Sequence, residues 1–226
     1  ALYDREGNSL AEGEIHGQNG GYPIAIALSN DAVKLAVSMI NINEGSVKST
    51  IAFYNYGTVG QNEIDHCVGV NNYDDMVIPE MEFTSNDRMV AFGDTKAVIF
   101  EGAQKPQAIA EIPMDEKTKS IFYNEHYIGI VTGNEDEAVT NHLAVYDENG
   151  KLVMEKDFGL DYSSIEFLTN NEICIRNANV CDIYTVHGVY KFHHEFEEEL
   201  FEIIPGKLKL NYTLVLKDTT QRIRLK

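Results

Sequence analysis

A short phrase recurs five times along the chain, and it limits the fold more than any other feature of the sequence. Each copy is an apolar stretch that ends in tyrosine or phenylalanine, and a glycine follows within two to four positions. The copies are ALYDREG, IAFYNYG, AVIFEG, LAVYDENG and DIYTVHG, with aromatic residues Tyr3, Tyr54, Phe100, Tyr146 and Tyr184. A strand followed by turn-forming residues and a glycine predicts a β-hairpin. The spacings of 51, 46, 46 and 38 residues therefore indicate a repeated β-structure.

A second pattern lies between these copies and also predicts a hairpin. An asparagine separates two apolar stretches in AIALSNDAVKLAVS, MEFTSNDRMVAFG, SIFYNEHYIGIV and IEFLTNNEICIR, at Asn30, Asn86, Asn124 and Asn170. Asparagine suits a tight turn because its side chain can bond to the nearby backbone. Interleaving the two patterns gives units of four short antiparallel strands, clearest over residues 80–114, 119–158 and 163–196. Four-stranded repeats of about 35 to 50 residues are typical of β-propeller blades.

We therefore expect an all-β chain, a β-propeller or propeller-like repeat that forms a single domain over residues 1–226. The two ends predict partial blades, an outer hairpin from residues 1–15 and inner strands from 200–226. These ends could close a ring of about five blades. The chain could equally be an open arc of a larger propeller. It lacks an initiator methionine and starts as if within a strand, which indicates a piece of a longer protein.

The net charge of the chain limits the classes of partner that it can bind. There are 36 acidic and 18 basic residues, which give a formal net charge of −18 at pH 7. Such a chain repels the phosphate backbone and anionic lipid surfaces, so we expect no nucleic-acid partner. No apolar run approaches the roughly 18 residues that a membrane-spanning helix needs. We therefore expect no membrane insertion by this segment.

No motif for catalysis, metal binding or a cofactor is recognisable in the sequence. It has no Gly-x-Ser-x-Gly elbow, no phosphate-binding glycine loop and no His-Glu-x-x-His. His193 and His194 are adjacent, but neighbours on a strand point to opposite faces and chelate poorly. The acidic turns lack the twelve-residue calcium loop with its closing glutamate. Acids near strand ends, such as Glu80, Glu82 and Asp94, are interpreted as solvated or turn-forming, and no catalytic or metal-binding residue and no cofactor is predicted.

The three cysteines, Cys67, Cys174 and Cys181, are too few for a disulfide framework. A two-residue turn at Asn177-Ala178 would place Cys174 directly opposite Cys181, within reach of a disulfide. A change of one residue in register removes that pairing. Since free thiols are the commoner state of buried cysteines, we expect three free thiols.

One stretch is longer than the blade pattern requires. Residues 58–80 read TVGQNEIDHCVGVNNYDDMVIPE, and long excursions on a rigid scaffold often carry binding. The simpler interpretation is an elaborated outer strand, IDHCVGV, and an ordinary connecting loop. As a binding site, this region would use tyrosine for contact area and polar side chains for hydrogen bonds. The candidate binding residues are Tyr56, Asn62, Asp65, His66, Tyr73, Asp74 and Asp75.

The sequence also resembles a known family. The stretches that carry the resemblance are YPIAIALSNDAVKLAVS, KSTIAFYNYGTVGQNEIDHCVG, MVAFGDTKAVIFEG and SIFYNEHYIGIV. They are similar to a family of propeller-like proteins of unknown function from Gram-positive gut bacteria, and more loosely to WD40-like and quinoprotein-like propellers. The chain departs from these looser relatives because it lacks their Gly-His and Trp-Asp pairs and contains no tryptophan.

The family resemblance implies a longer, membrane-anchored parent. Such a parent would have a short cytoplasmic start, one transmembrane helix, further blades and then this segment outside the cytoplasm. It assigns no activity, so no functional residue is carried over. We expect an extracytoplasmic binding or interaction module whose partner is an unidentified protein or cell-envelope ligand. The alternatives are a carbohydrate-active enzyme with carboxylates in the propeller channel, or a purely structural surface spacer.

Overall fold

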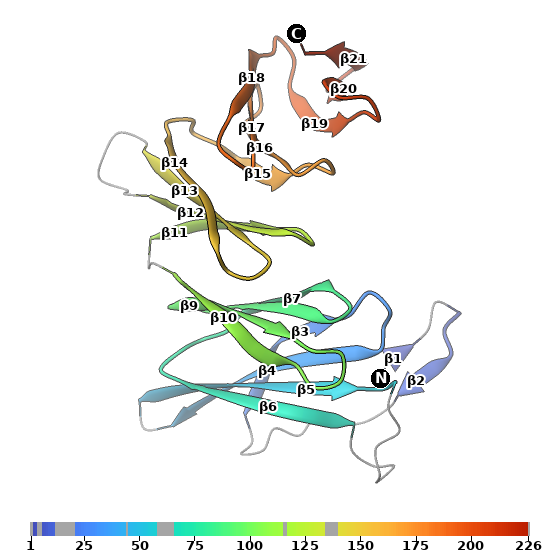
Figure 1. Ribbon diagram of the computed structural model, residues 1–226, viewed down its shortest axis with the longest axis vertical. Helices are drawn as coiled ribbons and strands as arrows, with labels where there is room; N and C mark the ends of the chain where they lie inside the picture. Colours follow the sequence, from blue (N-terminus) through green and yellow to red (C-terminus); the bar gives the residue numbers. More distant parts are fainter. Residues whose placement is uncertain are drawn as a thin grey trace. The chain divides into compact units, whose positions relative to one another are not determined.

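The computed structural model describes residues 2–3, 6–11, 21–43, 45–57, 66–114, 117–133 and 140–225. All regular elements of these residues are β-strands (Figure 1), which confirms the predicted all-β class. In the described part of the chain, no helix is long and apolar enough to span a bilayer. The chain forms two compact units, Ala1–Glu116 and Lys117–Lys226. The single domain expected from the sequence stays a prediction.

The first unit contains two four-stranded antiparallel sheets and a two-stranded ribbon. The ribbon pairs β1 (Leu2–Tyr3) with β2 (Ser9–Ala11). In both sheets the strands pair in chain order. The first sheet comprises β3 (Tyr22–Leu28), β4 (Lys34–Asn43), β5 (Ser46–Asn55) and β6 (Cys67–Asp74), and the second comprises β7 (Glu80–Ser85), β8 (Arg88–Phe92), β9 (Lys96–Glu101) and β10 (Gln107–Pro113).

The second unit contains two further four-stranded antiparallel sheets and a three-stranded one. The first sheet comprises β11 (Thr118–Tyr123), β12 (Tyr127–Gly133), β13 (Asn141–Asp147) and β14 (Leu152–Phe158). The second comprises β15 (Ser164–Phe167), β16 (Glu172–Arg176), β17 (Val180–Thr185) and β18 (Tyr190–Glu195). The third comprises β19 (Leu200–Pro205), β20 (Asn211–Leu216) and β21 (Thr220–Arg224).

These sheets confirm the predicted repeat unit. The three clearest predicted blades, 80–114, 119–158 and 163–196, coincide with the sheets β7–β10, β11–β14 and β15–β18. Residues 200–226 supply three strands, as expected for a partial blade. Of residues 1–15, the structure describes the β1–β2 ribbon and the turn residues beside it. Closure of a ring stays a prediction.

The repeated asparagines and aromatic residues have distinct structural roles. Each asparagine lies in the turn between the first and second strands of its sheet, as predicted. At Asn124, the side-chain Oδ1 accepts hydrogen bonds from the N–H groups of His126 (2.8 Å) and Tyr127 (2.9 Å). This side chain therefore holds the turn closed. Four of the aromatic residues, Tyr54, Phe100, Tyr146 and Tyr184, lie on the third strands.

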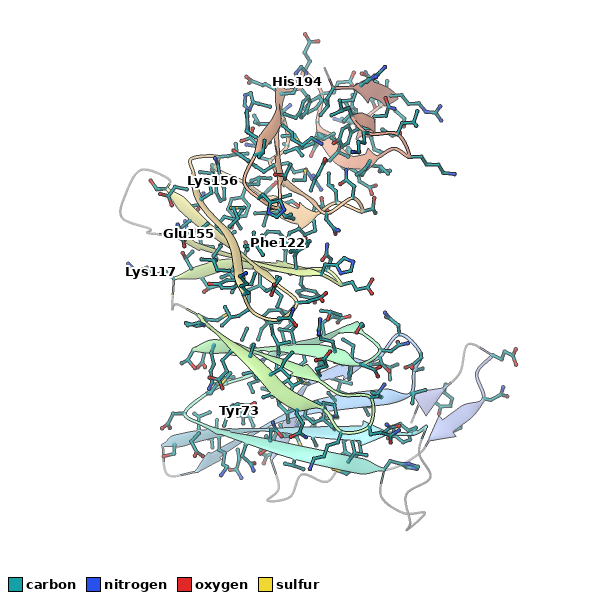
Figure 2. All side chains as sticks on the ribbon, in the orientation of Figure 1. Tyr73, Lys117, Phe122, Glu155, Lys156 and His194 are labelled. Atoms are coloured by element: carbon teal, nitrogen blue, oxygen red, sulfur yellow. The ribbon has the colours of Figure 1, made fainter. Side chains whose placement is uncertain are left out.

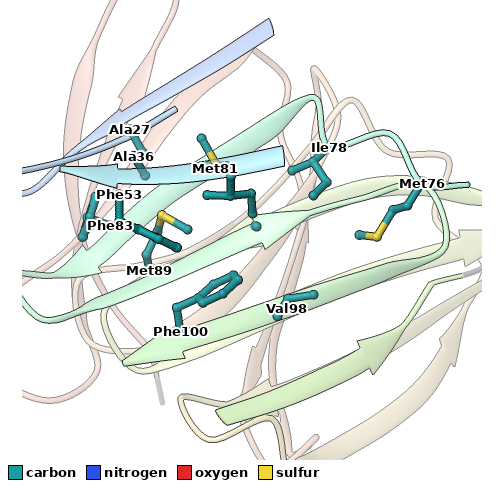
Figure 3. Close-up of a cluster of buried hydrophobic side chains, with 12 residues drawn as sticks. Ala27, Ala36, Phe53, Met76, Ile78, Met81, Phe83, Met89, Val98 and Phe100 are labelled. Atoms are coloured by element: carbon teal, nitrogen blue, oxygen red, sulfur yellow. The ribbon is translucent and has the colours of Figure 1, made fainter. Parts of the chain in front are cut away.

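The core of the first unit lies between its two four-stranded sheets (Figure 3). Alternate residues of each strand face this layer, because successive side chains of a strand point to opposite faces. Ile51 and Phe53 of β5 are almost completely buried, as are Val98 and Phe100 of β9. The rings of Phe53 and Phe100 lie 5.1 Å apart. Burying such side chains stabilises the fold by about 1.5–3 kcal/mol each.

The second unit has two such layers. Phe122 and Phe167, whose rings lie 4.6 Å apart, belong to the core between the sheets β11–β14 and β15–β18. A second core, between the sheets β15–β18 and β19–β21, contains Leu168, Phe196 and Leu214. Neighbouring sheets in this unit are therefore joined by continuous apolar cores.

The cysteine pair has a different register from the one considered above. Cys174 on β16 is opposite Ile183, and Cys181 on β17 is opposite Arg176. The turn lies one residue further along the chain than Asn177-Ala178, since the Asn177 N–H donates to the Val180 carbonyl (3.0 Å), so the two cysteines are not directly opposed. They are diagonal neighbours on one face of the sheet.

Candidate binding surface

The structure divides the candidate binding residues between the two ends of β6. Tyr56 and His66 lie at the end where β6 begins, whereas Tyr73, Asp74 and Asp75 lie where it ends. Since a strand rises about 3.4 Å per residue, the two groups are separated by roughly 25 Å. Asn62 and Asp65 lie outside the described residues.

At the first end, Tyr56 and His66 form an aromatic pair. Their ring centroids are 4.7 Å apart and the rings are inclined by 42°. Both side chains are half-buried, so part of each remains available to a partner. Burial raises the pKa of the Tyr56 hydroxyl. The Nδ1 atom of His66 is buried and has no hydrogen-bond partner in the part of the chain that the structure describes.

The backbone beneath this pair is held by hydrogen bonds. The N–H of Tyr56 donates to the carbonyl of Val33 (2.8 Å), and the N–H of Asn55 donates to the carbonyl of His66 (2.9 Å). Asn55 itself is buried, and its Oδ1 accepts a hydrogen bond from the N–H of Gly57 (3.0 Å). The position of the aromatic pair is therefore set by the end of the β3–β6 sheet.

Polar contacts join this end of the sheet to the β7–β10 sheet. Lys34 is buried, and its Nζ donates to the carbonyl of Asn86 and to the Asp87 carboxylate, each at 2.7 Å. The Asp31 N–H donates to the Asn86 side chain (3.1 Å). The Asn55 amide also approaches the carbonyls of Ala103 and Gln104 (3.4 Å each). Two sheets thus support one rim, and a rim of this kind suits recognition without large rearrangement.

The other group of candidate residues is engaged in packing and pairing. Tyr73, labelled in Figure 2, packs against the core, and the Nζ of Lys96 lies 5.7 Å from its ring centroid. Burial raises the pKa of the Tyr73 hydroxyl. The exposed Asp74 carboxylate lies 3.4 Å from the Nζ of Lys48, and Asp75 adopts a φ of 51° in the turn after β6. Packing, ion pairing and the turn after β6 therefore explain the residues at this end of the strand without a binding partner.

The segment after β6 is an inter-sheet connection. Met76 and Ile78 are buried. Their carbonyls accept hydrogen bonds from the hydroxyls of Ser49 (2.6 Å) and Ser38 (2.8 Å), both on the β3–β6 sheet. This geometry corresponds to the simpler interpretation, an outer strand followed by a connecting segment, for residues 67–80. Among the described residues of this region, the Tyr56–His66 pair is the part that the simpler interpretation does not account for.

Sequence reasoning missed the residues that support this rim. Asn55 and Lys34 anchor it, yet neither was a candidate. For Asn55 a local signal exists, because asparagine two positions before Gly57 is typical of a side-chain-closed turn. For Lys34 no local signal exists, since its partner Asp87 is 53 residues further along the chain.

The acidic and histidine residues considered for chemistry are dispersed. Glu80 and Glu82 lie two residues apart on β7, and burial, together with the charge of Glu80, raises the pKa of Glu82. Asp94 accepts a hydrogen bond from the Val77 N–H (3.1 Å), as expected for a turn residue. Among the described residues, no group of three or more histidine, cysteine or acidic side chains is placed to hold a metal ion. His193 instead contacts a carboxylate, with 2.7 Å between its Nδ1 and Oδ1 of Asp182.

The sequence matches the family of unknown function DUF5711 over residues 1–225, so the chain belongs to this family. No relative was found among curated proteins.

Several solved structures share the fold. The β-propeller domain of the Trilobed protease from Pyrococcus furiosus has a TM-score of 0.50 and 10% identity, covering 90% of this chain and 70% of that one. BamB from Moraxella catarrhalis has a TM-score of 0.45 and 10% identity, with 88% and 58% covered. The Pan2 WD40 domain of Neurospora crassa has a TM-score of 0.44 and 10% identity, with 92% and 66% covered. At such identities the likeness to the Pyrococcus domain shows a β-propeller fold alone. The chain spans less than two thirds of the length of the BamB structure.

Proposed function

We propose that this domain is an extracytoplasmic binding module that contacts a protein or cell-envelope ligand through the rim bearing Tyr56 and His66. The observation that carries the proposal is a half-buried aromatic pair, with ring centroids 4.7 Å apart, on a rim that two sheets support. The localisation rests on the family resemblance, which implies a membrane-anchored parent.

The chemistry of the pair suits recognition. A tyrosine offers a large, rigid contact area together with a hydroxyl, at a small cost in side-chain entropy. His66 adds a second ring face beside that of Tyr56. A partner that supplies an apolar surface with a hydrogen-bonding group at its edge would suit the two ring faces and the Tyr56 hydroxyl.

The fold also favours a binding role. A propeller-like scaffold presents its turns without involving the core in recognition, so the rim can vary while the sheets stay intact. The strongly negative charge of the chain, −18, favours partners that carry basic or neutral surfaces. Nucleic acid and anionic membrane surfaces are disfavoured for the same reason.

Binding is tested with point variants. Immobilised wild-type chain and the Tyr56→Ala/His66→Ala double variant are compared for capture from cell-envelope extract, and captured partners are then purified for affinity measurement. Removing an anchor of this kind costs about 2 kcal/mol, or roughly a 30-fold loss of affinity. Tyr22→Ala is the matched control, because Tyr22 is 76% exposed at the opposite end of the same sheet. Equal affinity for wild type and the double variant would sink the proposal.

The capture experiment and a separate turnover assay distinguish the alternatives. A purely structural spacer predicts no captured partner that depends on the aromatic pair. A carbohydrate-active enzyme predicts turnover of a glycan panel that is lost on replacing a single carboxylate, with Glu82→Gln the first variant to make because its pKa is raised. Such turnover would replace the binding proposal with a catalytic one.

A further inference from the structure

Two buried thiols are in contact within the second unit. Cys174 on β16 and Cys181 on β17 are both fully buried, and their Sγ atoms lie 3.6 Å apart. They are diagonal neighbours, since Cys181 is paired with Arg176, two residues beyond Cys174 on the same face. The sequence alone favours free thiols at these positions. The contact between the two sulfur atoms changes that expectation.

The surroundings leave these thiols few chemical roles. They belong to the apolar core between the sheets β15–β18 and β19–β21, among residues such as Leu168 and Phe196. The hydrogen bond with Cys181, together with burial, raises the pKa of the Cys174 thiol. A thiol of this kind is a poor nucleophile or metal ligand, because both roles need the thiolate. A disulfide bond between the two sulfur atoms also needs a thiolate to form, so it can form only while the thiols are open to solvent.

We propose that Cys174 and Cys181 form an oxidation site, in which a disulfide bond joins β16 to β17 when the chain meets a disulfide-bearing oxidant. One cysteine thiolate attacks a sulfur of the oxidant's disulfide, forms a mixed disulfide and releases one thiolate of the oxidant. The second cysteine thiolate attacks the protein sulfur of that mixed disulfide and releases the other oxidant thiolate. The two protein thiols lose two protons and two electrons, and the oxidant disulfide is reduced to two thiols.

Forming the bond requires the two sulfur atoms and the hairpin backbone to move. A disulfide bond is about 2.05 Å long, so the sulfur atoms must approach by roughly 1.5 Å. Diagonal neighbours in a sheet have α-carbons about 7–8 Å apart, slightly beyond the usual span of a disulfide, so rotation of the two side chains must be accompanied by a shift of the hairpin backbone. Because both thiols are buried, the exchange takes place during folding or during opening of this part of the unit, before the last sheet covers them.

The bond would lock a turn that supports the last sheet. The N–H groups of Phe196 and Leu200 donate to the carbonyls of Asn179 and Ala178, each at 2.7 Å. These two carbonyls lie in the turn between β16 and β17, which a bond between Cys174 and Cys181 would close. The oxidised chain would therefore present a fixed docking site for β19. This role is independent of the proposed binding rim in the first unit.

The test uses the wild-type chain folded in a buffer of oxidised and reduced glutathione, and again in dithiothreitol. After removal of the buffer thiols, denaturation and thiol titration, we expect one free thiol in the first sample and three in the second, because Cys67 has no part in the bond. Trypsin cleaves after Arg176, between the two cysteines, so the bond should hold two tryptic peptides together until reduction. Cys174→Ser and Cys181→Ser should each abolish the linked peptides, whereas Cys67→Ser should leave them. Three free thiols from the glutathione sample, or a linked peptide containing Cys67, would overturn the proposal.

Discussion

Replacing Lys191 by methionine probes a polar network that joins the last two sheets of the second unit. The Nζ of Lys191 donates to Oε1 of Glu172 and to the Tyr212 hydroxyl, the latter at 3.1 Å. The Tyr212 hydroxyl in turn donates to Oε2 of Glu172 at 2.5 Å. Methionine retains most of the apolar length of the lysine side chain, so Lys191→Met removes the charge and changes the packing little.

The loss of stability expected for Lys191→Met follows from the burial of the Lys191–Glu172 ion pair. The Lys191 and Glu172 side chains are 19% and 11% exposed. Removing the cation therefore leaves a nearly buried carboxylate whose remaining side-chain donor, in the part of the chain that the structure describes, is Tyr212. Breaking a fully buried ion pair in this way costs about 3–5 kcal/mol. Residual solvent contact on both side chains reduces this figure, and we expect about 2–3 kcal/mol for Lys191→Met.

The measurement is urea unfolding followed by far-ultraviolet circular dichroism, because the chain has no tryptophan for fluorescence. The informative partner is the double variant Glu172→Gln/Lys191→Met, which removes both charges. It should be more stable than Lys191→Met alone, since no unpaired charge is left buried. A cost below about 0.5 kcal/mol for Lys191→Met, or a double variant less stable than Lys191→Met, would refute this account of the network.

The same network predicts a pH dependence. Burial lowers the pKa of Lys191, but the hydrogen bonds with Glu172 and Tyr212 outweigh it and leave the pKa above its ordinary value of 10.5. The folded state therefore holds this proton more tightly than the unfolded state. The resulting stability is fully present below pH 10.5 and is lost as the pH rises through the folded pKa. The difference in stability between wild type and Lys191→Met should shrink over that alkaline range.

Two further predictions concern packing and titration. Gly129→Ala should lower the free energy of unfolding by about 1–3 kcal/mol, because the new Cβ would lie 2.2 Å from the buried Phe122 ring. Gly133→Ala on the same strand would meet the flexible end of Lys119 and should lower it by less than about 0.5 kcal/mol. Equal urea midpoints for the two variants would contradict this expectation. Burial raises the pKa of Tyr184 to about 12. The stability of the wild type should therefore fall between pH 10 and 12 by more than that of Tyr184→Phe. Parallel curves of stability against pH would show that Tyr184 titrates alike in the folded and unfolded states.

The repeat could be predicted from the sequence because its signals are local. A turn such as the one at Asn124 is closed by bonds to residues two and three positions away, and a single window of sequence contains all of them. Each sheet likewise pairs strands that follow one another along the chain. The bounds of the blades over 80–114, 119–158 and 163–196 could therefore be placed closely without a structure.

The grouping of the candidate site residues and the polar network could not be predicted from local sequence. Glu172 and Tyr212 are 40 residues apart and meet only because two sheets pack face to face. The register at Cys174 depended on the position of a turn, which the residues around Asn177 do not specify. Tyr56 and His66 were both candidates, but only the structure separates them from Tyr73, which lies at the other end of β6.

Contacts between neighbouring sheets distinguish the rim bearing Tyr56 and His66 from the polar residues that recur in the repeats. In three sheet pairs, a polar side chain in or beside the first turn of one sheet bonds to the equivalent region of the next. These pairs are Lys34–Asp87, Asn124–Asn171 and Glu172–Tyr212. The recurring polar residues are thus occupied in joining sheets, and substituting them would change stability before it changed recognition. Tyr56 and His66 stand at the same end of the first sheet but have no counterpart in this scheme. This contrast supports our proposal that their aromatic faces contact an external partner.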